Sequence, residues 1–162
     1  MADLSLPIAP TLPLELAGLQ NLIGFQLRMA QVAMHREFVA AMAEVALTEK
    51  QYAALHLIHA NPGASQADIA VILGTDRATM MALVDRLDQR ELVERRRSNN
   101  DRRRQELHLT AAGKVLLVNA ERILAEHEAQ FASMFSEKEL KAVMAALARF
   151  HGQDEIMPTN LR

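Results

Sequence analysis

The chain has 162 residues, enough for one sizeable hydrophobic core or for a small domain with a helical extension. Half of the residues are hydrophobic and only 4% are aromatic, a composition typical of packed helices and not of a β-sandwich. Cysteine is absent, which excludes disulfides, thiolate metal sites and cysteine redox sensing. The net charge of −2 does not by itself indicate a nucleic-acid binder, but binding depends on where the arginines lie.

Membrane and secretion signals are not found in the sequence. No apolar run reaches the roughly 18 residues that a membrane span needs. The Met-Ala-Asp start lacks the basic residues of a signal peptide. We therefore expect a soluble cytoplasmic protein with no membrane partner.

The N-terminal part divides into an arm and a helix. Three prolines in residues 1–13 predict an extended arm, which either packs on the partner subunit of a dimer or is a disordered terminus. From Leu14 to about Glu44, apolar residues recur at helical spacing. This spacing predicts one long helix, with Gly18 or Gly24 as the place of a bend.

Capping signals predict two short helices next. Residues 48–51, Thr-Glu-Lys-Gln, have the pattern of a capping box, and the Asn-Pro-Gly at residues 61–63 is a strong turn signal that ends the helix. Ser65 caps the second helix, and Gly74 ends it.

A third helix and an arginine-rich hairpin follow. Thr75 with Asp76 caps the helix, which runs to about Arg90 and turns an apolar stripe to the core (Met80, Leu83, Val84 and Leu87). Short β-prone runs at residues 92–93 and 107–109 predict a small hairpin. We assign its tip to residues 95–104, of which six are arginines and one is acidic. So much like charge on a short segment indicates an anionic partner.

Two more helices complete the chain. Thr110 caps the first, which continues to about Met134, and a capping box at residues 136–139 opens the last, which ends at Phe150. The terminal helices carry apolar stripes that the part between them is too small to bury. We therefore predict that they pack together and against a second copy of the chain, most simply as a symmetric dimer. The predicted parts are a dimerising arm and helix (1–45), a domain of three helices and the arginine-rich hairpin that meets the anionic partner (46–110), and dimerising C-terminal helices (111–162).

Four motifs in this order carry a family resemblance. Three are short: Leu47-Thr48-Glu49-Lys50-Gln51-Tyr52, Ala67-Asp68-Ile69-Ala70 and Leu83-Val84-Asp85-Arg86-Leu87. The fourth, Asp101-x-Arg103-x-x-x-Leu107-x-Leu109-Thr110-x-x-Gly113, is the most specific, because its spacing fixes a wing and the helix after it. Together they resemble the MarR family of bacterial transcription regulators over roughly residues 20 to 150.

The resemblance implies a fold and a function. The expected fold is mostly α with a small β-hairpin wing: a winged helix-turn-helix domain, with N- and C-terminal helices forming a dimerisation domain. Members of the family are dimers that bind palindromic operators in double-stranded DNA, and many are released by small phenolic or aromatic carboxylate ligands. Two departures stand out. Glu91 replaces the Gly that usually leads into the wing, so we predict a bend that needs no positive φ. Ala78, Met81 and Ala82 replace polar residues, which favours apolar contacts with thymine methyl groups.

The third helix is the predicted reading helix, because a helix fits the major groove and its N-terminal residues usually reach base edges. Arg77 is the best candidate for a guanine contact; the alternative is a solvated arginine that pairs with Asp76 or with the phosphate backbone. Arg86 either binds DNA or forms a local ion pair with Asp85. The residues predicted to bind DNA from this helix are Thr75, Arg77, Thr79, Met81 and Arg86.

The wing is the second predicted contact with DNA. The resemblance implies that Arg103 reaches the minor groove while Asp101 holds its guanidinium, and a narrow minor groove does attract an inserted arginine. We expect the remaining arginines to contact phosphates or to steer the encounter: Arg95, Arg96, Arg97, Arg102 and Arg104. The alternative is that these arginines only form a solvated charged surface. Their position in a hairpin and the near absence of acidic residues beside them argue against this alternative.

An effector site is expected where the family's pocket lies, between the first two helices and the helix after the wing. Arg28 and Arg36 are eight residues apart, near one face of a helix, so together they can meet a carboxylate. The candidate residues are Phe25, Arg28, Met29, His35, Arg36, His56 and His59, with Phe38 as a further apolar wall. Taken singly, each histidine is more simply a surface or core residue. We expect no metal and no cofactor, since the histidines and acidic residues do not have the sequence spacing typical of metal ligands.

The resemblance, together with these residues, implies a ligand-responsive repressor released from a palindromic operator by an aromatic carboxylate, a phenolic compound or a thioester. An effector-independent DNA-binding protein and a winged-helix protein-interaction module are the alternatives. An enzyme is disfavoured, because the sequence has no glycine-rich phosphate loop, no Cys nucleophile, no Gly-x-Ser-x-Gly elbow and no paired-carboxylate cleft.

Overall fold

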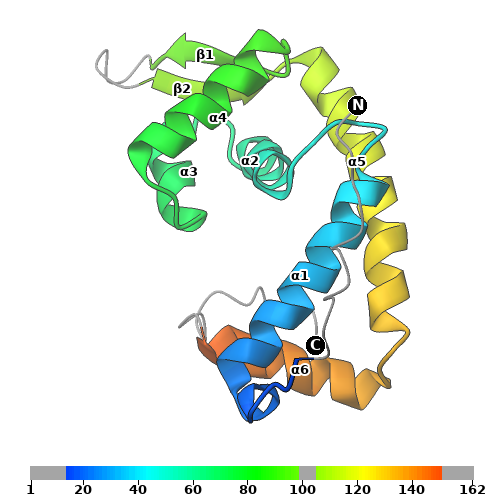
Figure 1. Cartoon of the computed structure of the whole chain (residues 1–162). Coiled ribbons are helices and arrows are strands. Elements are labelled where there is room, and N and C mark those ends of the chain that lie inside the picture. Colours follow the sequence, from blue (N-terminus) through cyan, green and yellow to red (C-terminus); the bar gives the residue numbers. More distant parts are fainter. Residues whose placement is uncertain (1–13, 99–104, 151–162) are drawn as a thin grey trace. The chain divides into compact units, whose positions relative to one another are not determined.

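The computed structural model describes residues 14–98 and 105–150. Six α-helices and one antiparallel hairpin make up most of this part, which confirms the predicted fold class (Figure 1). The elements, in chain order, are η1 (Leu19–Asn21), α1 (Ile23–Ala41), α2 (Glu49–Ala60), α3 (Gln66–Ile72), α4 (Arg77–Gln89), β1 (Val93–Arg97), β2 (Gln105–Leu109), α5 (Ala111–Ala132) and α6 (Glu137–Phe150). The chain forms two compact units, the first ending at Arg36 and the second beginning at Glu37. The Pro-rich arm of residues 1–13 lies outside the described residues.

The first unit holds η1 and most of α1. The prediction of one helix from Leu14 was wrong over its first residues, because α1 begins only at Ile23. Gly18 has a φ of +92°, which lies in the left-handed region, and Leu22 is extended with a ψ of 126°. These two conformations isolate the short 3₁₀ turn of η1 from the α-helix. Gly24 lies inside α1.

The second unit has the helix starts that the capping signals predicted. In α2 the backbone N–H of Gln51 donates to Thr48 Oγ1 at 3.2 Å, and that of Thr48 donates to Gln51 Oε1 at 3.0 Å. Ser65 caps α3 in the same reciprocal way, and Thr110 caps α5. Each cap satisfies backbone donors that a helix start leaves without intrahelical partners.

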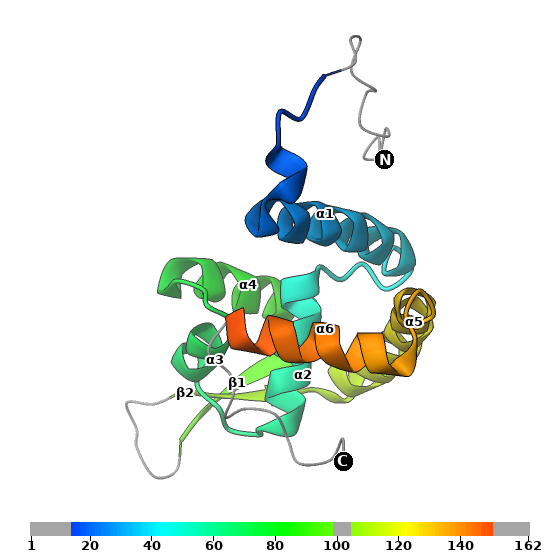
Figure 2. The same cartoon turned by 90° about the horizontal axis from the view of Figure 1, so that it is seen from below.

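One hydrophobic core joins α2, α3, α4, α5 and the hairpin, which gather together (Figure 2). The apolar stripe predicted for the third helix is buried in this core (Met80, Leu83, Val84 and Leu87). A fully buried side chain of this size stabilises the fold by roughly 1.5–3 kcal/mol. Because the stripe fixes which side of α4 faces inward, the opposite side faces solvent.

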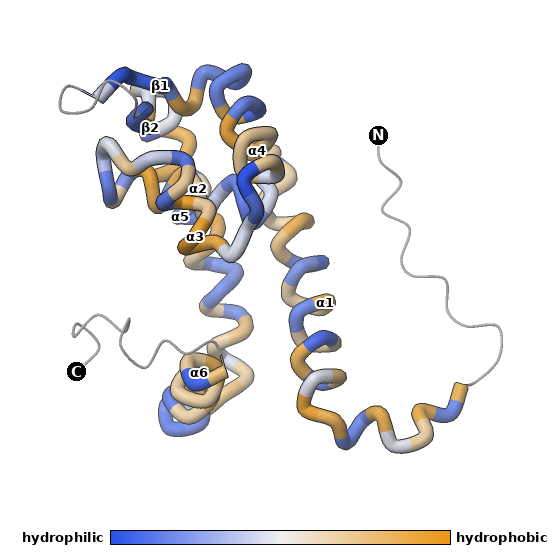
Figure 3. Tube along the Cα trace, turned by 90° about the vertical axis from the view of Figure 1, so that its left-hand side faces the viewer, coloured by the Kyte–Doolittle hydropathy of each residue, from blue (hydrophilic) through white to orange (hydrophobic). Residues whose placement is uncertain are grey.

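The hairpin is longer than predicted. Its register pairs Val93 with Leu109, Arg95 with Leu107 and Arg97 with Gln105. The assignment of the first three arginines to the tip was therefore wrong, because they belong to β1, which is coloured hydrophilic in Figure 3. The backbone ladder to β2 holds this strand, and side-chain β-propensity was a poor guide to its length.

The turn before β1 corrects another prediction. Glu91 has a φ of +57°, so the bend does use the left-handed region despite its side chain. Thr110 Oγ1 donates to the carbonyl of Glu91 at 2.6 Å, and the backbone N–H of Leu92 donates to Leu87 O at 3.0 Å. These bonds hold a conformation that costs a non-glycine residue about 1–2 kcal/mol.

Candidate nucleic-acid interface

Asp76 fixes the start of α4. Its Oδ1 accepts from the backbone N–H of Thr79 at 2.9 Å, and its Oδ2 accepts from the Thr79 hydroxyl at 2.6 Å. These hydrogen bonds hold the pKa of Asp76 below its usual range. The cap therefore stabilises the helix above the ordinary aspartate pKa, and its contribution is lost as the pH falls through the lowered value.

The predicted reading residues lie at this helix start. Arg77, Thr79 and Met81 are exposed on α4, whereas Thr75 precedes it, is half-buried and donates to Leu73 O at 3.2 Å. In the described part no ion pair joins Arg77 to Asp76, whose two oxygens both accept from Thr79. Arg77 thus projects from the N-terminal turn of a helix whose other side is buried in the core. This is the placement from which a guanidinium fork can reach a base edge or a phosphate.

Arg86 lies further along the same helix, beside α2. It is exposed and lines a groove of about 280 Å³ together with Thr48, Lys50 and Thr79. The predicted alternative of an Asp85–Arg86 pair is not what the structure shows, because Asp85 pairs with Arg95 of β1. The two cations along this groove, Lys50 and Arg86, favour an anion such as a DNA phosphate. Lys50 was missed in the sequence analysis, because its four-residue motif was used only to predict a helix start.

The three arginines of β1 have different surroundings. Arg95 is the least exposed, with 24% of its side chain accessible, and it bridges two aspartates of α4. Arg96 is 58% exposed and pairs with Glu94 on its own strand. Arg97 is also exposed. Arg96 and Arg97 are therefore the arginines that β1 presents to solvent. Asp101, Arg102, Arg103 and Arg104 lie outside the described residues.

The predicted effector residues are divided between the two units. Phe25, Arg28, Met29, His35 and Arg36 belong to the first unit, where all except Phe25 are exposed. His56 and His59 are exposed on α2 in the second unit.

His56 has partners of its own in the second unit. Its Nδ1 lies 3.2 Å from Glu121 Oε1, and its ring stacks on Tyr52 with centroids 6.0 Å apart. Burial, and then the carboxylates of Glu121 and Glu128, raise the pKa of Tyr52. The phenol beside His56 is therefore neutral at ordinary pH and can act as a hydrogen-bond donor.

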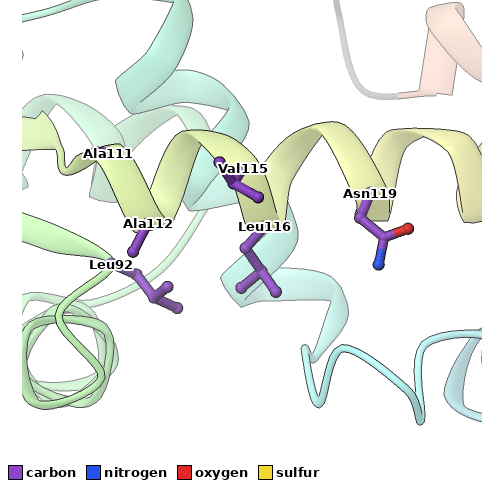
Figure 4. Close-up of a pocket in the computed structure, with 6 residues that line it drawn as sticks. All are labelled: Leu92, Ala111, Ala112, Val115, Leu116 and Asn119. Atoms are coloured by element: carbon purple, nitrogen blue, oxygen red, sulfur yellow. The ribbon is translucent and has the colours of Figure 1, made fainter.

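An apolar groove lies along the first half of α5 (Figure 4). Its volume is about 530 Å³, and it is lined by Leu92, Ala111, Ala112, Val115, Leu116 and Asn119. Val115 is 73% exposed in it. None of the predicted effector residues lines this groove.

Metal and membrane signals are not found in the described ranges, 14–98 and 105–150. There, no group of three or more His, Cys, Asp or Glu side chains is arranged to hold a metal ion. Within the same ranges, the helices are too short or too polar to cross a bilayer.

Comparison with known proteins shows the family to which this chain belongs. The MarR family model matches residues 47–104, from the start of α2 into the wing. A protein assigned to the transcriptional regulation of the hcr operon in Thauera aromatica is 33% identical over 141 residues, which cover 86% of this chain and 85% of that protein. This chain belongs to the MarR family. As a MarR-family protein it is a transcriptional regulator and not an enzyme.

Solved structures of MarR-family relatives agree in fold. The transcriptional repressor CouR bound to a 23-mer DNA duplex has a TM-score of 0.82 and 34% identity, over 86% of this chain and 99% of CouR. CouR bound to p-coumaroyl-CoA has a TM-score of 0.81 and 32% identity, over 87% of this chain and 99% of CouR. Among these relatives, one fold thus binds both a DNA duplex and an aromatic acyl thioester.

Proposed function

We propose that this MarR-family protein is a homodimeric repressor that binds a palindromic operator in double-stranded DNA through α4 and the wing. The observation that carries the proposal is the exposed, arginine-bearing side of α4 next to a hairpin that presents two further arginines to solvent. The similarity to DNA-bound CouR supports it. Arg77, with Thr75, Thr79 and Met81, reads the major groove, and Arg103, oriented by Asp101, enters the minor groove. Arg86, Arg96, Arg97, Arg102 and Arg104 bind phosphates.

Exposed apolar residues on the C-terminal helices support dimerisation through them. Val115 and Val118 of α5 are 73% and 67% exposed, and Met144 and Phe150 of α6 are 49% and 62% exposed. Large apolar side chains exposed along a helix are costly to leave in water and mark association surfaces. Residues 1–45 and 111–162 accordingly form the dimerisation parts, and residues 46–110 form the DNA-binding part.

Operator binding and its salt dependence test the DNA function. We expect the protein to bind a duplex from the region upstream of its own gene, with log K falling by about 0.9 per neutralised phosphate as log salt rises. Arg103→Ala is expected to weaken binding and to reduce this slope. Arg122→Ala is the matched control, because Arg122 pairs with Glu126 on α5. Fluorescence anisotropy at several salt concentrations measures both quantities. Absence of binding at low salt would favour a protein-interaction module instead.

The effector is the second part of the proposed function. We propose that an aromatic carboxylic acid, a phenolic compound or a coenzyme A thioester of such an acid releases the protein from DNA. CouR bound to p-coumaroyl-CoA supports this class of ligand, and the neutral phenol of Tyr52 beside His56 offers polar groups on α2. The residues proposed to meet the effector are Phe25, Arg28, Met29, His35, Arg36, His56 and His59.

Release by such a ligand is expected to depend on Arg36. Titrating p-coumaroyl-CoA and p-coumaric acid into the protein–DNA complex should lower the anisotropy of labelled DNA for the wild type. Arg36→Ala should blunt the response and leave binding without ligand unchanged, whereas Arg149→Ala on α6 should behave as wild type. A complex insensitive to both ligands and to related aromatic acids would favour an effector-independent DNA-binding protein.

A further inference from the structure

Arg95 connects the wing to the reading helix. Its Nη1 donates to Asp88 Oδ2 at 3.0 Å, and its Nη2 donates to Asp85 Oδ1. The two aspartates are three residues apart, on adjacent turns of α4, so their carboxylates lie on one side of the helix. A single planar guanidinium thus joins a strand to two successive turns of a helix.

The local charge makes Arg95 a poor ligand for DNA. One positive charge faces two carboxylates, so the cluster is net negative. A phosphate would have to displace a carboxylate that already accepts a charge-assisted hydrogen bond. Arg96 differs, because it pairs with the neighbouring Glu94 of its own strand and is 58% exposed, against 24% for Arg95.

The cluster also spans the joint between α4 and β1. Between the end of α4 and the start of β1 lie only residues 90–92, and Glu91 among them has a φ of +57°. Backbone bonds from Leu92 N to Leu87 O and from Thr110 N to Leu92 O hold the near end of this joint. The Arg95 side chain adds a point of attachment further along the strand, so rotation about the joint is restrained.

We propose that Arg95 is a positioning residue, which holds the wing at a fixed distance from the reading helix through Asp85 and Asp88 and does not itself bind DNA phosphate. The inference rests on the proposed DNA-binding function. Its physical benefit is preorganisation: a wing already fixed relative to α4 loses less conformational freedom when both enter adjacent grooves. It replaces the sequence-based assignment of Arg95 to phosphate binding.

Substitution of Arg95 by lysine distinguishes a positioning role from a contribution of positive charge alone. Lysine keeps the positive charge but lacks the planar fork that reaches two carboxylates at once. We expect Arg95→Lys to weaken operator binding about three- to tenfold, since partly exposed ion pairs of this kind are individually modest, with the salt slope unchanged. Arg122→Lys on α5, where the guanidinium pairs with Glu126, is the matched control and should bind as wild type. Equal effects of the two substitutions would overturn the proposal.

A double-mutant cycle supplies the decisive measurement. In an Asp85→Ala, Asp88→Ala background both acceptors of the bridge are absent, so Arg95→Lys should have no further effect on operator affinity. A direct contact with DNA predicts the same loss in both backgrounds, which would contradict the positioning role. Circular dichroism melts check that all variants are folded.

Failure of the DNA function remains distinguishable from failure of this inference. If the wild-type protein binds no duplex at low salt, the proposed function fails. In that case hydrogen exchange still tests the bridge. Arg95→Lys should speed exchange of the β1 and β2 amides, and Arg96→Lys should not. Unchanged exchange in Arg95→Lys would overturn the proposal.

Discussion

Gly113→Ala is expected to destabilise the protein by about 3 kcal/mol or more, the upper end of what overpacking costs. A Cβ at position 113 would lie 2.0 Å from the carbonyl oxygen of Leu92 and 2.9 Å from its carbonyl carbon. Both are backbone atoms, so no side chain can move aside to relieve the clash. The same carbonyl accepts from the backbone N–H of Thr110 at 3.1 Å, which fixes its position. Urea denaturation followed by circular dichroism measures the change.

Gly24→Ala is the control for this prediction. Gly24 lies in α1, and no atom lies within 4 Å of the Cβ position there. Alanine is the better helix former, so this variant should be unchanged or more stable by up to about 1 kcal/mol. A Gly113→Ala protein as stable as Gly24→Ala would show that α5 does not pack against the backbone at Leu92 as the structure has it.

The same contact links stability to DNA binding. Leu92 immediately precedes β1, and Gly113 lies in the first turn of α5. Forcing α5 away from Leu92 would shift the strand that carries the wing arginines. The Thr110-x-x-Gly113 part of the family motif thus has a physical reason. Thr110 caps α5 through the backbone N–H of Gly113 at 2.9 Å, and the glycine allows the close approach.

Local signals were sufficient to predict most of the fold. The starts of α2, α3 and α5 follow from side chains that hydrogen-bond three residues ahead, an interaction that a spacing in the sequence reveals. The inward side of α4 followed from apolar periodicity. The start of α1 did not, because apolar periodicity continues through Gly18 although its positive φ interrupts the helix.

Side-chain contacts between different helices and strands could not be predicted from the sequence. The partners of Arg95 lie ten and seven residues before it, across a turn whose geometry depends on Glu91 adopting a positive φ. No local rule predicts that conformation for glutamate. The arginine run therefore appeared uniform, whereas the structure divides β1 into one bridging and two exposed arginines.

This division also explains how a chain with a net charge of −2 can present a basic surface. Acids near the reading helix are engaged within the protein. Asp76 caps α4, and Asp85 and Asp88 are paired with Arg95. The exposed guanidinium groups of Arg77, Arg86 and Arg97 are then left to face a duplex. Distribution, and not total charge, determines the field that a nucleic acid meets.

Arg77→Ala is expected to produce the largest loss of operator recognition in the described part of the chain. A bidentate arginine–guanine contact contributes about 1–3 kcal/mol of discrimination, which corresponds to a roughly 5- to 150-fold weaker complex. Arg77 is exposed at the first position of α4, and its neighbours Ala78 and Met81 offer no hydrogen bonds from their side chains that could replace it. Competition binding with the operator and an unrelated duplex measures affinity and specificity together.

The ratio of the two affinities decides what Arg77 contacts. If it reads guanine, Arg77→Ala weakens the operator complex much more than the complex with the unrelated duplex, because the lost contact depends on the base. If it binds phosphate, both complexes weaken equally and the salt slope falls by about 0.9. Arg122→Ala removes the same charge from α5, where the guanidinium already pairs with Glu126 at 2.8 Å, and should change neither affinity. If Arg77→Ala weakens both complexes equally, we would assign base recognition to Thr79, Met81 and the wing instead.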